Sequence, residues 1–276
     1  MRLPIYQLDA FTDRTFGGNP AAVCLLDSWL DDATLQAISL ENNLSETAFL
    51  VPGENGDYDL RWFTPTLEVD LCGHATLASA WLILNRLAPE RTGVAFATRS
   101  GRLHVTRHGD SLLMDFPADP PAPTAVPEGL EGVLGATPVA ALRGRYWMTV
   151  LGTEAEVRDL NPNLDGIKRL ADGHMIVTAP GEQVDFVSRF FAPGSGIAED
   201  PVTGSAHCIL APYWATRLGK QDLKARQLSS RGGELRCRLD AERVKLLGHC
   251  AFYLEGRIEV PDHKRAGREA DRAARK

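Results

Sequence analysis

The chain has 276 residues, of which 44% are hydrophobic and 24% charged, a balance typical of a globular protein with one large domain or two of ordinary size. Its formal net charge of −6 argues against a nucleic-acid partner or an anionic membrane surface, because both select basic faces. Five cysteines occur without a C-x-x-C pair, and neither a signal peptide nor a membrane-spanning run is visible, so we expect a cytoplasmic protein.

Strand-like and helix-like patterns alternate in the first part of the chain. Strands are predicted where apolar and polar residues alternate, and helices where apolar residues recur at helical spacing. The second helix is apolar nearly all round, which indicates burial. The predicted strands cover residues 3–11, 21–26, 45–51, 58–64, 93–98, 102–108 and 111–116, and the predicted helices cover 31–43 and 75–87.

A proline-rich segment at residues 117–129 interrupts this pattern and is the best candidate for a linker. It predicts an N-terminal domain over residues 1–117 and a C-terminal domain over 118–262. The remaining residues, 263–276, carry charges of both signs and few apolar side chains, which is typical of a solvated tail. A last strand near 250–260 is expected to pack back on the N-terminal domain.

The second part of the chain reads as strands that lead to one long helix. Four strands are expected first, and the chain then closes with a series of antiparallel strands. The first four strands are predicted at 145–152, 155–160, 174–179 and 184–191, the helix at 206–219, and the closing strands within 226–240 and 243–260.

Two stretches of sequence share one pattern. RWFTPTLEVDLCGHATLASA begins at Arg61, and RFFAPGSGIAEDPVTGSAHC begins at Arg189. Each runs Arg, aromatic, Phe, small residue and Pro, then a loop with acids, then a glycine that opens a helix. This match predicts internal duplication with approximate two-fold symmetry, and a cleft between two such halves is a natural ligand site. Asp70 and Asp200 are placed at equivalent positions of the two loops.

Each repeat brings a glycine, Gly73 or Gly204, to the start of a helix. The first backbone N–H groups of a helix lack internal partners and carry partial positive charge, so they receive a carboxylate or a developing oxyanion well. Either glycine alone is as readily explained by a tight turn. Their occurrence as a pair in matching contexts favours a binding site.

The acids near these turns are candidates for proton transfer. Glu46 stands at the entry of a predicted core strand, where partial desolvation would raise its pKa toward the range useful for an acid or base. An exposed or ion-paired Glu46 is an equally good interpretation of the sequence. Asp70 or Asp200 could instead cap a turn, and Asp200 has the stronger claim to a site because Glu199 beside it can take a structural role.

Polar residues near the glycines and Glu46 add weaker candidates. His74 follows Gly73, where the helix dipole disfavours a charged imidazole, so that a neutral ring could hydrogen-bond a substrate. A structural role is the more common one for a lone histidine, and His207 is weaker still. Asn19 and Ser45 are plausible polar contacts, although loops carry such residues for turn geometry too.

Several familiar chemistries are missing from the sequence. It holds no G-x-S-x-G elbow, no G-x-x-x-x-G-K-[ST] loop and no G-x-G-x-x-G after a strand. No cluster of His, Cys and carboxylate residues shows zinc or iron spacing along the chain. We therefore expect no nucleotide, metal or flavin cofactor.

Four ordered motifs, FGGNPAAV, SETAFL, DLCGHATLASA and GIAEDPVTGSAH, resemble the PhzF family of phenazine-biosynthesis isomerase-like proteins. The resemblance runs from the first strand to about residue 260. It implies an α+β fold similar to diaminopimelate epimerase, with two pseudo-symmetric domains, each a curved sheet around a central helix. That fold agrees with the duplication described above.

The resemblance also implies cofactor-free proton transfer on a small carboxylate-bearing substrate and a homodimer. By motif, Glu46 would be the catalytic acid/base, assisted by His74 and Asp200, and the N–H groups after Gly73 and Gly204 would hold the substrate. The other residues that would line the pocket are Asn19, Ser45 and Ser205. The motifs do not identify the substrate.

Two further functions remain open at this point. The related epimerases use a cysteine at each of two helix starts, whereas here Cys72 stands at the first turn and no cysteine stands at the second. Cys208 lies inside the second helix, where burial is expected. An epimerase or racemase that uses Glu46 or Cys72 is the first alternative, and a non-catalytic protein that binds a small ligand is the second.

Overall fold

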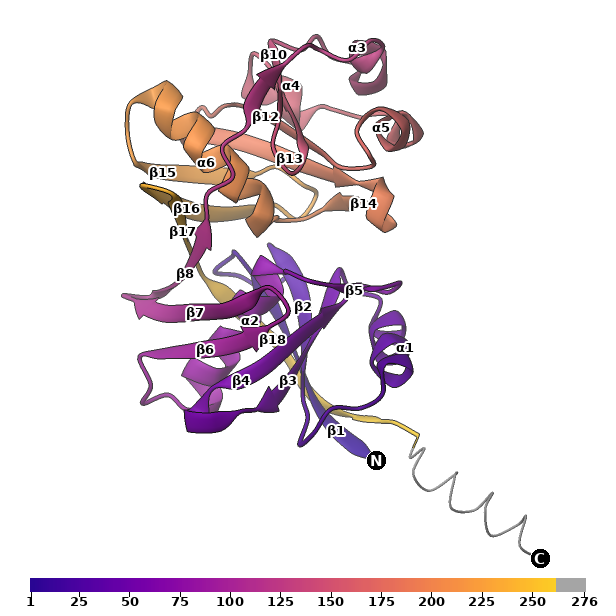
Figure 1. The fold of residues 1–276 in the computed structure, drawn as a ribbon, viewed down its shortest axis with the longest axis vertical. Helices are drawn as coiled ribbons and strands as arrows, with labels where there is room; N and C mark the ends of the chain where they lie inside the picture. The colour runs from indigo at the N-terminus through magenta and orange to yellow at the C-terminus, as the bar shows by residue number, and fades with distance from the viewer. Residues whose placement is uncertain (262–276) are drawn as a thin grey trace, which may run out of the picture.

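Two similar sets of strands, each wrapped around one buried helix, make up the structure, a computed structural model that describes residues 1–261 (Figure 1). The central helices are α2 (Gly73–Leu82) and α6 (Gly204–Leu218). In α2, every residue from Gly73 to Ala80 is buried, and so is Leu82. The apolar pattern of this helix therefore reflects its place inside a curved sheet. The predicted α+β class is confirmed.

The N-terminal set wraps around α2 and carries one further helix on its outside. That helix, α1, begins after Asp31, whose side chain accepts a hydrogen bond from the Thr34 amide, and ends at Asn43 in a left-handed conformation. The elements of this set are β1 (Arg2–Ala10), β2 (Asn19–Leu25), α1 (Asp32–Asn42), β3 (Glu46–Pro52), η1 (Glu54–Gly56), β4 (Tyr58–Phe63), β5 (Glu68–Val69), α2, η2 (Ile83–Leu87), β6 (Gly93–Thr98), β7 (Gly101–His108) and β8 (Ser111–Pro117).

The C-terminal set wraps around α6 in the same way. Its elements are β9 (Ala122–Thr124), α3 (Leu130–Leu134), β10 (Ala140–Arg143), β11 (Trp147–Val150), α4 (Glu154–Arg158), α5 (Leu164–Leu170), β12 (Met175–Pro180), β13 (Phe186–Ala192), η3 (Pro193–Ser195), β14 (Ile197–Asp200), α6, β15 (Asp222–Gln227), β16 (Gly233–Asp240) and β17 (Arg243–Gly248). The last strand, β18 (Cys250–Glu259), returns to the N-terminal set.

The strand pairings of the two sets match one by one. In the first set β2–β3 and β4–β6 are parallel, whereas β1–β2, β3–β4, β4–β5, β6–β7 and β7–β8 are antiparallel. In the second set β11–β12 and β13–β15 are parallel, whereas β10–β11, β12–β13, β13–β14, β15–β16 and β16–β17 are antiparallel. This agreement supports the duplication inferred from the sequence.

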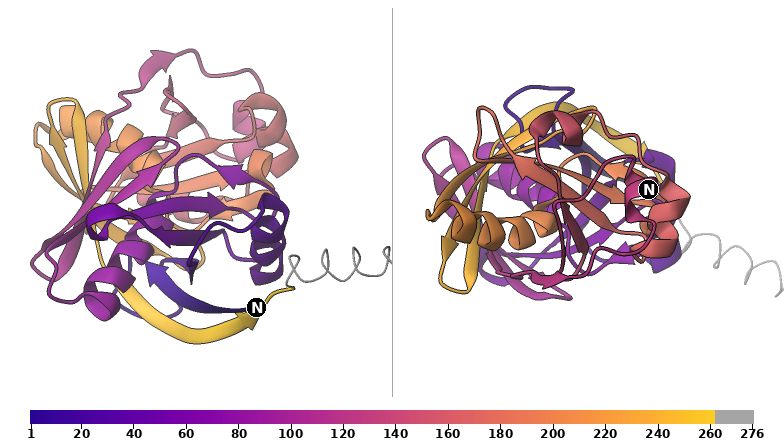
Figure 2. Two further views of the ribbon diagram at one scale, coloured as in Figure 1. Left: turned by 60° about the horizontal axis from the view of Figure 1, so that its bottom comes forward. Right: turned by 90° about the horizontal axis from the view of Figure 1, so that it is seen from above.

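Two strand pairings join the sets. β8 pairs with β17, and β18 runs antiparallel to β1 with Arg2 opposite Glu259. Figure 2 shows β18 curving along the outside of the N-terminal set beside β1. The chain therefore crosses between the sets twice, first after β8 and again after β17, and this holds α2 and α6 close together.

Most of the predicted elements are present, and one prediction is wrong. Residues 155–160 were expected to form a strand, but Glu154–Arg158 is helix α4. The reason is a capping box, in which Thr153 and Glu156 satisfy each other's free backbone N–H groups. The proline-rich segment contains the short strand β9, and the domain boundary placed there stays a prediction. The predicted tail lies outside the described residues.

Among the helices of residues 1–261, none combines the length and the apolar character needed to cross a bilayer.

Candidate active site

The two central helices begin at the same place. A Cβ atom built on Gly73 would lie 3.3 Å from the Cα atom of Gly204, and one built on Gly204 would lie 3.4 Å from the Cα atom of Gly73. Cys72 and Thr203 precede the helices with extended backbones, and neither side chain caps the N–H groups of its own helix. Two helix N-termini with free donors therefore face one location, which suits a carboxylate or an oxyanion.

Glu46 lies beside the start of α2. It is the first residue of β3 and pairs in parallel with Ala21 of β2. Its side chain is 14% exposed, and its Oε2 atom lies 3.2 Å from Nε2 of His74. Neither of these two buried atoms makes a well-aligned hydrogen bond within the described residues. The pair thus retains hydrogen-bonding capacity for a ligand.

Asn19 links the two sets of strands at the site. Its Nδ2 atom faces three acceptors, at 2.7 Å from Oδ1 of Asp200, 3.0 Å from the carbonyl oxygen of Val202 and 3.1 Å from Nδ1 of His74. Asn19 is fully buried at the start of β2. This one amide therefore fixes His74 from the N-terminal set relative to Asp200 from the C-terminal set.

The contacts of His74 indicate its tautomer and charge. Because Asn19 donates to Nδ1, the neutral ring carries its proton on Nε2, which faces Glu46. Burial lowers the pKa of His74 to about 3, so the ring is neutral over the ordinary pH range. A neutral His74 is a hydrogen-bond donor toward Glu46 and toward a ligand held beside it.

Asp200 is held by residues that follow it in the loop and in β15. Thr203 donates its hydroxyl to Oδ2, and Nε2 of Gln227 donates to the backbone oxygen of Asp200 over 2.7 Å. Burial raises the pKa of Asp200 to about 6, while the hydrogen bonds from Thr203 and Asn19 oppose this shift. The carboxyl group is therefore largely ionised at neutral pH.

Burial is also the main cause that raises the pKa of Glu46, to about 8. The negative charge of Asp200 raises it further, and a hydrogen bond with Cys72 opposes the shift. Glu46 is thus mostly protonated at neutral pH and ionises close to it. A carboxyl group with such a pKa can both take and return a proton, as a general base and then a general acid.

Cys72 completes a cluster with Glu46 and His74. Its Sγ atom lies 3.5 Å from Nδ1 of His74, and burial raises the pKa of the thiol well above its usual range. One ligand-type atom from each of the three side chains lies within 4.8 Å of the others. These are the residues of the described chain that could hold a metal ion, although they also suit proton transfer without one.

The structure corrects the equivalence of Asp70 and Asp200. In β4–β5 Trp62 pairs with Val69, and in β13–β14 Phe190 pairs with Asp200, so Val69 is the counterpart of Asp200. Asp70 is exposed at the surface. The sequence alignment failed because it matched two acids across loops of unequal length, whereas strand pairing sets the true correspondence.

Two ion pairs confirm the corrected alignment. Arg61 binds both carboxylate oxygens of Glu68 over 2.7 Å, and Arg189 binds those of Glu199 over 2.7 and 2.8 Å. Glu68 stands five positions before Gly73, and Glu199 stands five positions before Gly204. Glu199 therefore has the structural role expected for it, which leaves its neighbour free to face the site.

The remaining candidates from the sequence are Ser45, Ser205, His207 and Cys208, and they differ in burial and in their contacts. Ser45 directly precedes Glu46 and is half-buried, and within the described residues its side chain has no hydrogen bond. Ser205, in the first turn of α6, lies 3.3 Å from the hydroxyl of Tyr146. His207 is buried and bonds through Nδ1 to the carbonyl oxygen of Thr203. Cys208 is buried inside α6, as expected.

Three residues of the site neighbourhood were missed by sequence reasoning. Thr203 and Gln227 anchor Asp200, and Tyr146 contacts Ser205. Thr203 could have been found as the counterpart of Cys72, since each immediately precedes its helix glycine. Gln227 and Tyr146 stand in strand-like sequence with no motif around them, so no local signal marks them.

Comparisons with known proteins agree with this geometry. Residues 8–256 match the family model PhzC-PhzF, described as phenazine biosynthesis-like protein. A relative named as an uncharacterized isomerase of Pseudomonas aeruginosa is 53% identical, over 94% of this chain and 100% of its own length. A crystal structure of a phenazine biosynthesis protein of the PhzF family from Enterococcus faecalis is 43% identical, with a TM-score of 0.91 over 94% of this chain and 100% of that one.

The fold extends to more distant enzymes. A hydroxyproline epimerase from Agrobacterium vitis shares 9% of the sequence and superposes with a TM-score of 0.62 over 95% of this chain and 93% of that one. At this identity the likeness concerns the fold alone. The epimerase-like architecture expected from the motifs is therefore confirmed.

Proposed function

Since this chain belongs to the PhzC-PhzF family of phenazine biosynthesis-like proteins, and is an isomerase like its named relatives, we propose that it moves a proton on a small carboxylate-bearing substrate without a cofactor. Glu46 is the acid/base of this proposal. The observation that carries it is the position of one carboxyl group, with its pKa raised to about 8, beside the meeting point of two helix N-termini.

The proposed reaction begins with Glu46 in its ionised form. Its carboxylate takes a proton from a carbon atom of the substrate, and the electron pair of the broken C–H bond moves toward the conjugated carboxyl group as an enol or dienol forms. The free N–H groups at Gly73 and Gly204 stabilise the negative charge that develops there. Glu46, now a carboxylic acid, returns the proton to a different carbon atom, so that no proton is gained or lost overall.

His74 and Asp200 have supporting roles in this scheme. The Nε2–H group of His74 faces Glu46 over 3.2 Å and is proposed to donate to its carboxylate during the reaction. Asp200 holds Asn19, and its charge keeps the pKa of Glu46 high enough for the carboxylic acid to form after proton abstraction. Asn19, Ser45 and Ser205 are proposed to contact the substrate.

Replacement of the acid/base tests the proposal directly. Small carboxylates are incubated with the protein in heavy water, and mass gain identifies those that exchange carbon-bound hydrogen. Glu46→Gln keeps the shape of the side chain and removes the proton carrier, so we expect deuterium uptake to fall by on the order of 10³-fold, within the range for general acid–base catalysis. Uptake by this variant at the wild-type rate, with the fold intact by circular dichroism, would remove Glu46 from the mechanism.

One observation favours a second candidate, an epimerase in which Cys72 and Glu46 exchange protons on opposite sides of one carbon atom. Cys72 occupies the cap position of α2 and lies in the same cluster as Glu46 and His74. Its high thiol pKa argues against it as a base, because the thiolate is the reactive form.

We further propose, from the family resemblance and the cysteine usage, a homodimer that acts in the cytoplasm.

A further inference from the structure

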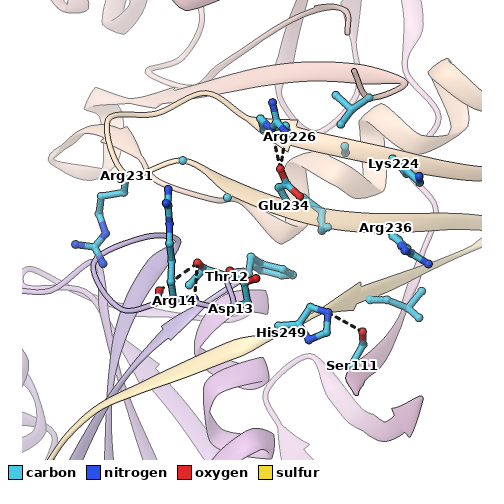
Figure 3. A pocket seen from close by; sticks show the side chains of 17 residues that line it. Thr12, Asp13, Arg14, Ser111, Lys224, Arg226, Arg231, Glu234, Arg236 and His249 are labelled. Carbon is cyan, nitrogen blue, oxygen red and sulfur yellow. Dashed lines mark hydrogen bonds and ion pairs between the residues drawn. The ribbon is translucent and has the colours of Figure 1, made fainter. Parts of the chain in front are cut away.

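A groove of about 990 Å³ lies between the two sets of strands (Figure 3). The segment from Phe11 to Arg14, together with Ser111 and His249, contributes one side, and residues 224–226 of β15 and 231–236 around the start of β16 contribute the other. None of the proposed catalytic or substrate-binding residues lines it. The groove is therefore separate from the site at Glu46.

The groove carries more positive than negative charge, although the whole chain is acidic. Two acidic residues, Asp13 and Glu234, line it beside five cationic ones: Arg14, Lys224, Arg226, Arg231 and Arg236. Arg226 is bound to Glu234 and Arg231 to Asp9, so these two charges are already compensated. Arg14, Lys224 and Arg236 have no carboxylate within ion-pair distance among the described residues.

Two of these uncompensated cations face each other across a strand pairing. Lys224 of β15 lies directly opposite Arg236 of β16. Like charges at directly opposed positions destabilise a sheet. The flanking pairs of the same two strands are complementary, with Arg226 opposite Glu234 on one side and Asp222 opposite Arg238 on the other. The like-charged pair is thus an exception within an otherwise balanced ladder.

The surroundings of this pair leave its charges available. The carboxylate of Asp185 lies near Lys224, but it already accepts bonds from the Lys220 ammonium group and from the Lys224 backbone amide. Lys224 and Arg236 are exposed, and Arg14 extends toward the groove from the opposite side in Figure 3. Lys224 and Arg236 therefore present two uncompensated charges next to each other on one side of the groove, while Arg14 stands on the other side (Figure 3).

We propose that this groove binds small molecules with two or more adjacent anionic groups, phosphates or carboxylates, through Lys224 and Arg236. A bound anion would relieve the repulsion between Lys224 and Arg236, since Arg and Lys both form strong charge-assisted hydrogen bonds to such groups. This proposal is independent of the reaction assigned to Glu46.

The groove ends close to the catalytic helices. Phe11 lines it, adopts a left-handed backbone with φ of 61°, and accepts a hydrogen bond from the Glu234 amide over 3.0 Å. Its ring lies 4.0 Å from the point that a Cβ atom on Gly204 would occupy. The aromatic side chain of Phe11 thus stands between this end of the groove and the start of α6.

Calorimetric titration with inorganic pyrophosphate at constant ionic strength tests the proposal. The wild-type chain is compared with Lys224→Gln/Arg236→Gln and with a control, Lys168→Gln/Arg169→Gln on α5, which makes the same change in net charge away from the groove. We expect saturable binding to the wild type and to the control, and a dissociation constant raised at least about tenfold in the groove variant. Citrate in place of pyrophosphate determines whether phosphate or carboxylate groups are preferred.

The stability of each variant keeps this test interpretable. Because the substitutions remove like-charge repulsion, we expect the melting temperature of the groove variant without ligand to equal or exceed that of the wild type at low salt. Equal affinity for pyrophosphate in all three proteins would overturn the proposal. Binding of heparin by the wild type without binding of pyrophosphate or citrate would overturn it too, because that result assigns the groove to a polyanion.

Discussion

The starts of the two central helices share their geometry and differ in their chemistry. Each follows an antiparallel strand pair closed by a two-point Arg–Glu ion pair, and each begins with a glycine that touches its counterpart. At the cap position, however, one helix has Cys72 and the other has Thr203. At the strand position four residues before each glycine, one has Val69 and the other has Asp200.

This difference shows how a duplicated scaffold becomes an asymmetric site. The groups suited to exchange protons, Glu46 and Cys72, lie in the N-terminal set together with His74. The C-terminal set contributes Asp200, whose carboxylate is held in place by hydrogen bonds. Its negative charge raises the pKa of Glu46. Both sets supply free helix N–H groups. In the proposed mechanism, both sets share the anchoring of the substrate, while proton transfer is assigned to the N-terminal set.

After replacement of Glu46 itself, the largest effect is expected when this asymmetry is removed at Asp200. Asp200→Asn keeps the size of the side chain and deletes the charge that raises the pKa of Glu46. We expect deuterium uptake to fall by on the order of 10²-fold, because an amide at position 200 accepts weaker hydrogen bonds from Asn19 and cannot accept the Thr203 hydroxyl through its Nδ2 group. The acid limb of the pH–rate profile, set by Glu46 near pH 8 in the wild type, moves to lower pH, since a neutral neighbour no longer disfavours the carboxylate.

A matched change in the other set controls for general disturbance. Val69→Thr alters the counterpart position with a side chain of equal shape and should leave both the rate and the pH profile close to those of the wild type. The comparison is made by measuring the uptake rate of the two variants between pH 5 and pH 10. This range brackets the pKa of about 8 given for Glu46. An unchanged profile for Asp200→Asn would mean that Asp200 and Glu46 do not interact.

A second comparison concerns the two glycines. Gly73→Ala would bring a methyl group 3.3 Å from the Cα atom of Gly204, a backbone atom that cannot turn aside. Gly204→Ala makes a contact of 3.4 Å, which is close to ordinary packing. We expect Gly73→Ala to lower deuterium uptake about tenfold by moving the helix starts apart, and Gly204→Ala to lower it less.

Thermal unfolding separates this effect from a loss of stability. Alanine favours a helix over glycine by about 1 kcal/mol, so that neither variant should unfold much earlier than the wild type. Wild-type rates for both glycine variants would contradict the view that the contact between the helix starts positions their N–H groups.

The sequence predicted those parts of the molecule that local patterns specify. The apolar periodicity of α2 and α6, the glycines at their starts and the Arg-aromatic-Phe repeat are all short-range signals, and each corresponds to an element of the structure. Glu46 was open to two interpretations, because desolvation depends on what covers a strand end. Only the packing of α2 against β3 decides that it is nearly buried.

The failures come from pairings that the sequence does not contain. Asp70 was matched to Asp200 by residue type, whereas the hydrogen bonds between strands match Val69 to Asp200. Gln227, which anchors the site from β15, is separated from Asp200 by the whole of α6. The like-charged pair of Lys224 and Arg236 is invisible until the register of two strands is known.

The burial of Glu46 in the N-terminal set makes the free energy of unfolding depend on pH, and this dependence can be measured. The pKa of Glu46 rises from 4.5, the ordinary value of a glutamate, which applies to the unfolded chain, to about 8 in the folded chain. The folded state therefore keeps its proton while the unfolded state loses it, and the stability of the wild type falls as the pH rises from about 4.5 to about 8. Glu46→Gln lacks this loss, so the variant becomes the more stable protein above pH 8.

Urea unfolding of the two proteins at pH 4 and pH 9 tests this sign. We expect nearly equal free energies of unfolding at the lower pH and an advantage for Glu46→Gln of more than about 1.4 kcal/mol, the worth of one pKa unit, at the higher pH. A difference that does not change with pH would show that Glu46 ionises in the folded chain as it does in the unfolded one.

The smallest effect on the rate is expected at the two cap positions, Cys72 and Thr203. Cys72→Ser should change deuterium uptake by less than about threefold, because a general acid–base step carried by Glu46 does not need a thiol. Thr203→Val removes the hydroxyl that donates to Asp200, and the chain should lose about 1 kcal/mol of stability. If Cys72→Ser instead abolishes uptake as Glu46→Gln does, two opposed proton carriers are at work. That outcome would favour the epimerase over the isomerase that uses a single carboxyl group, and the N-terminal cap would then be a catalytic position while its counterpart is structural.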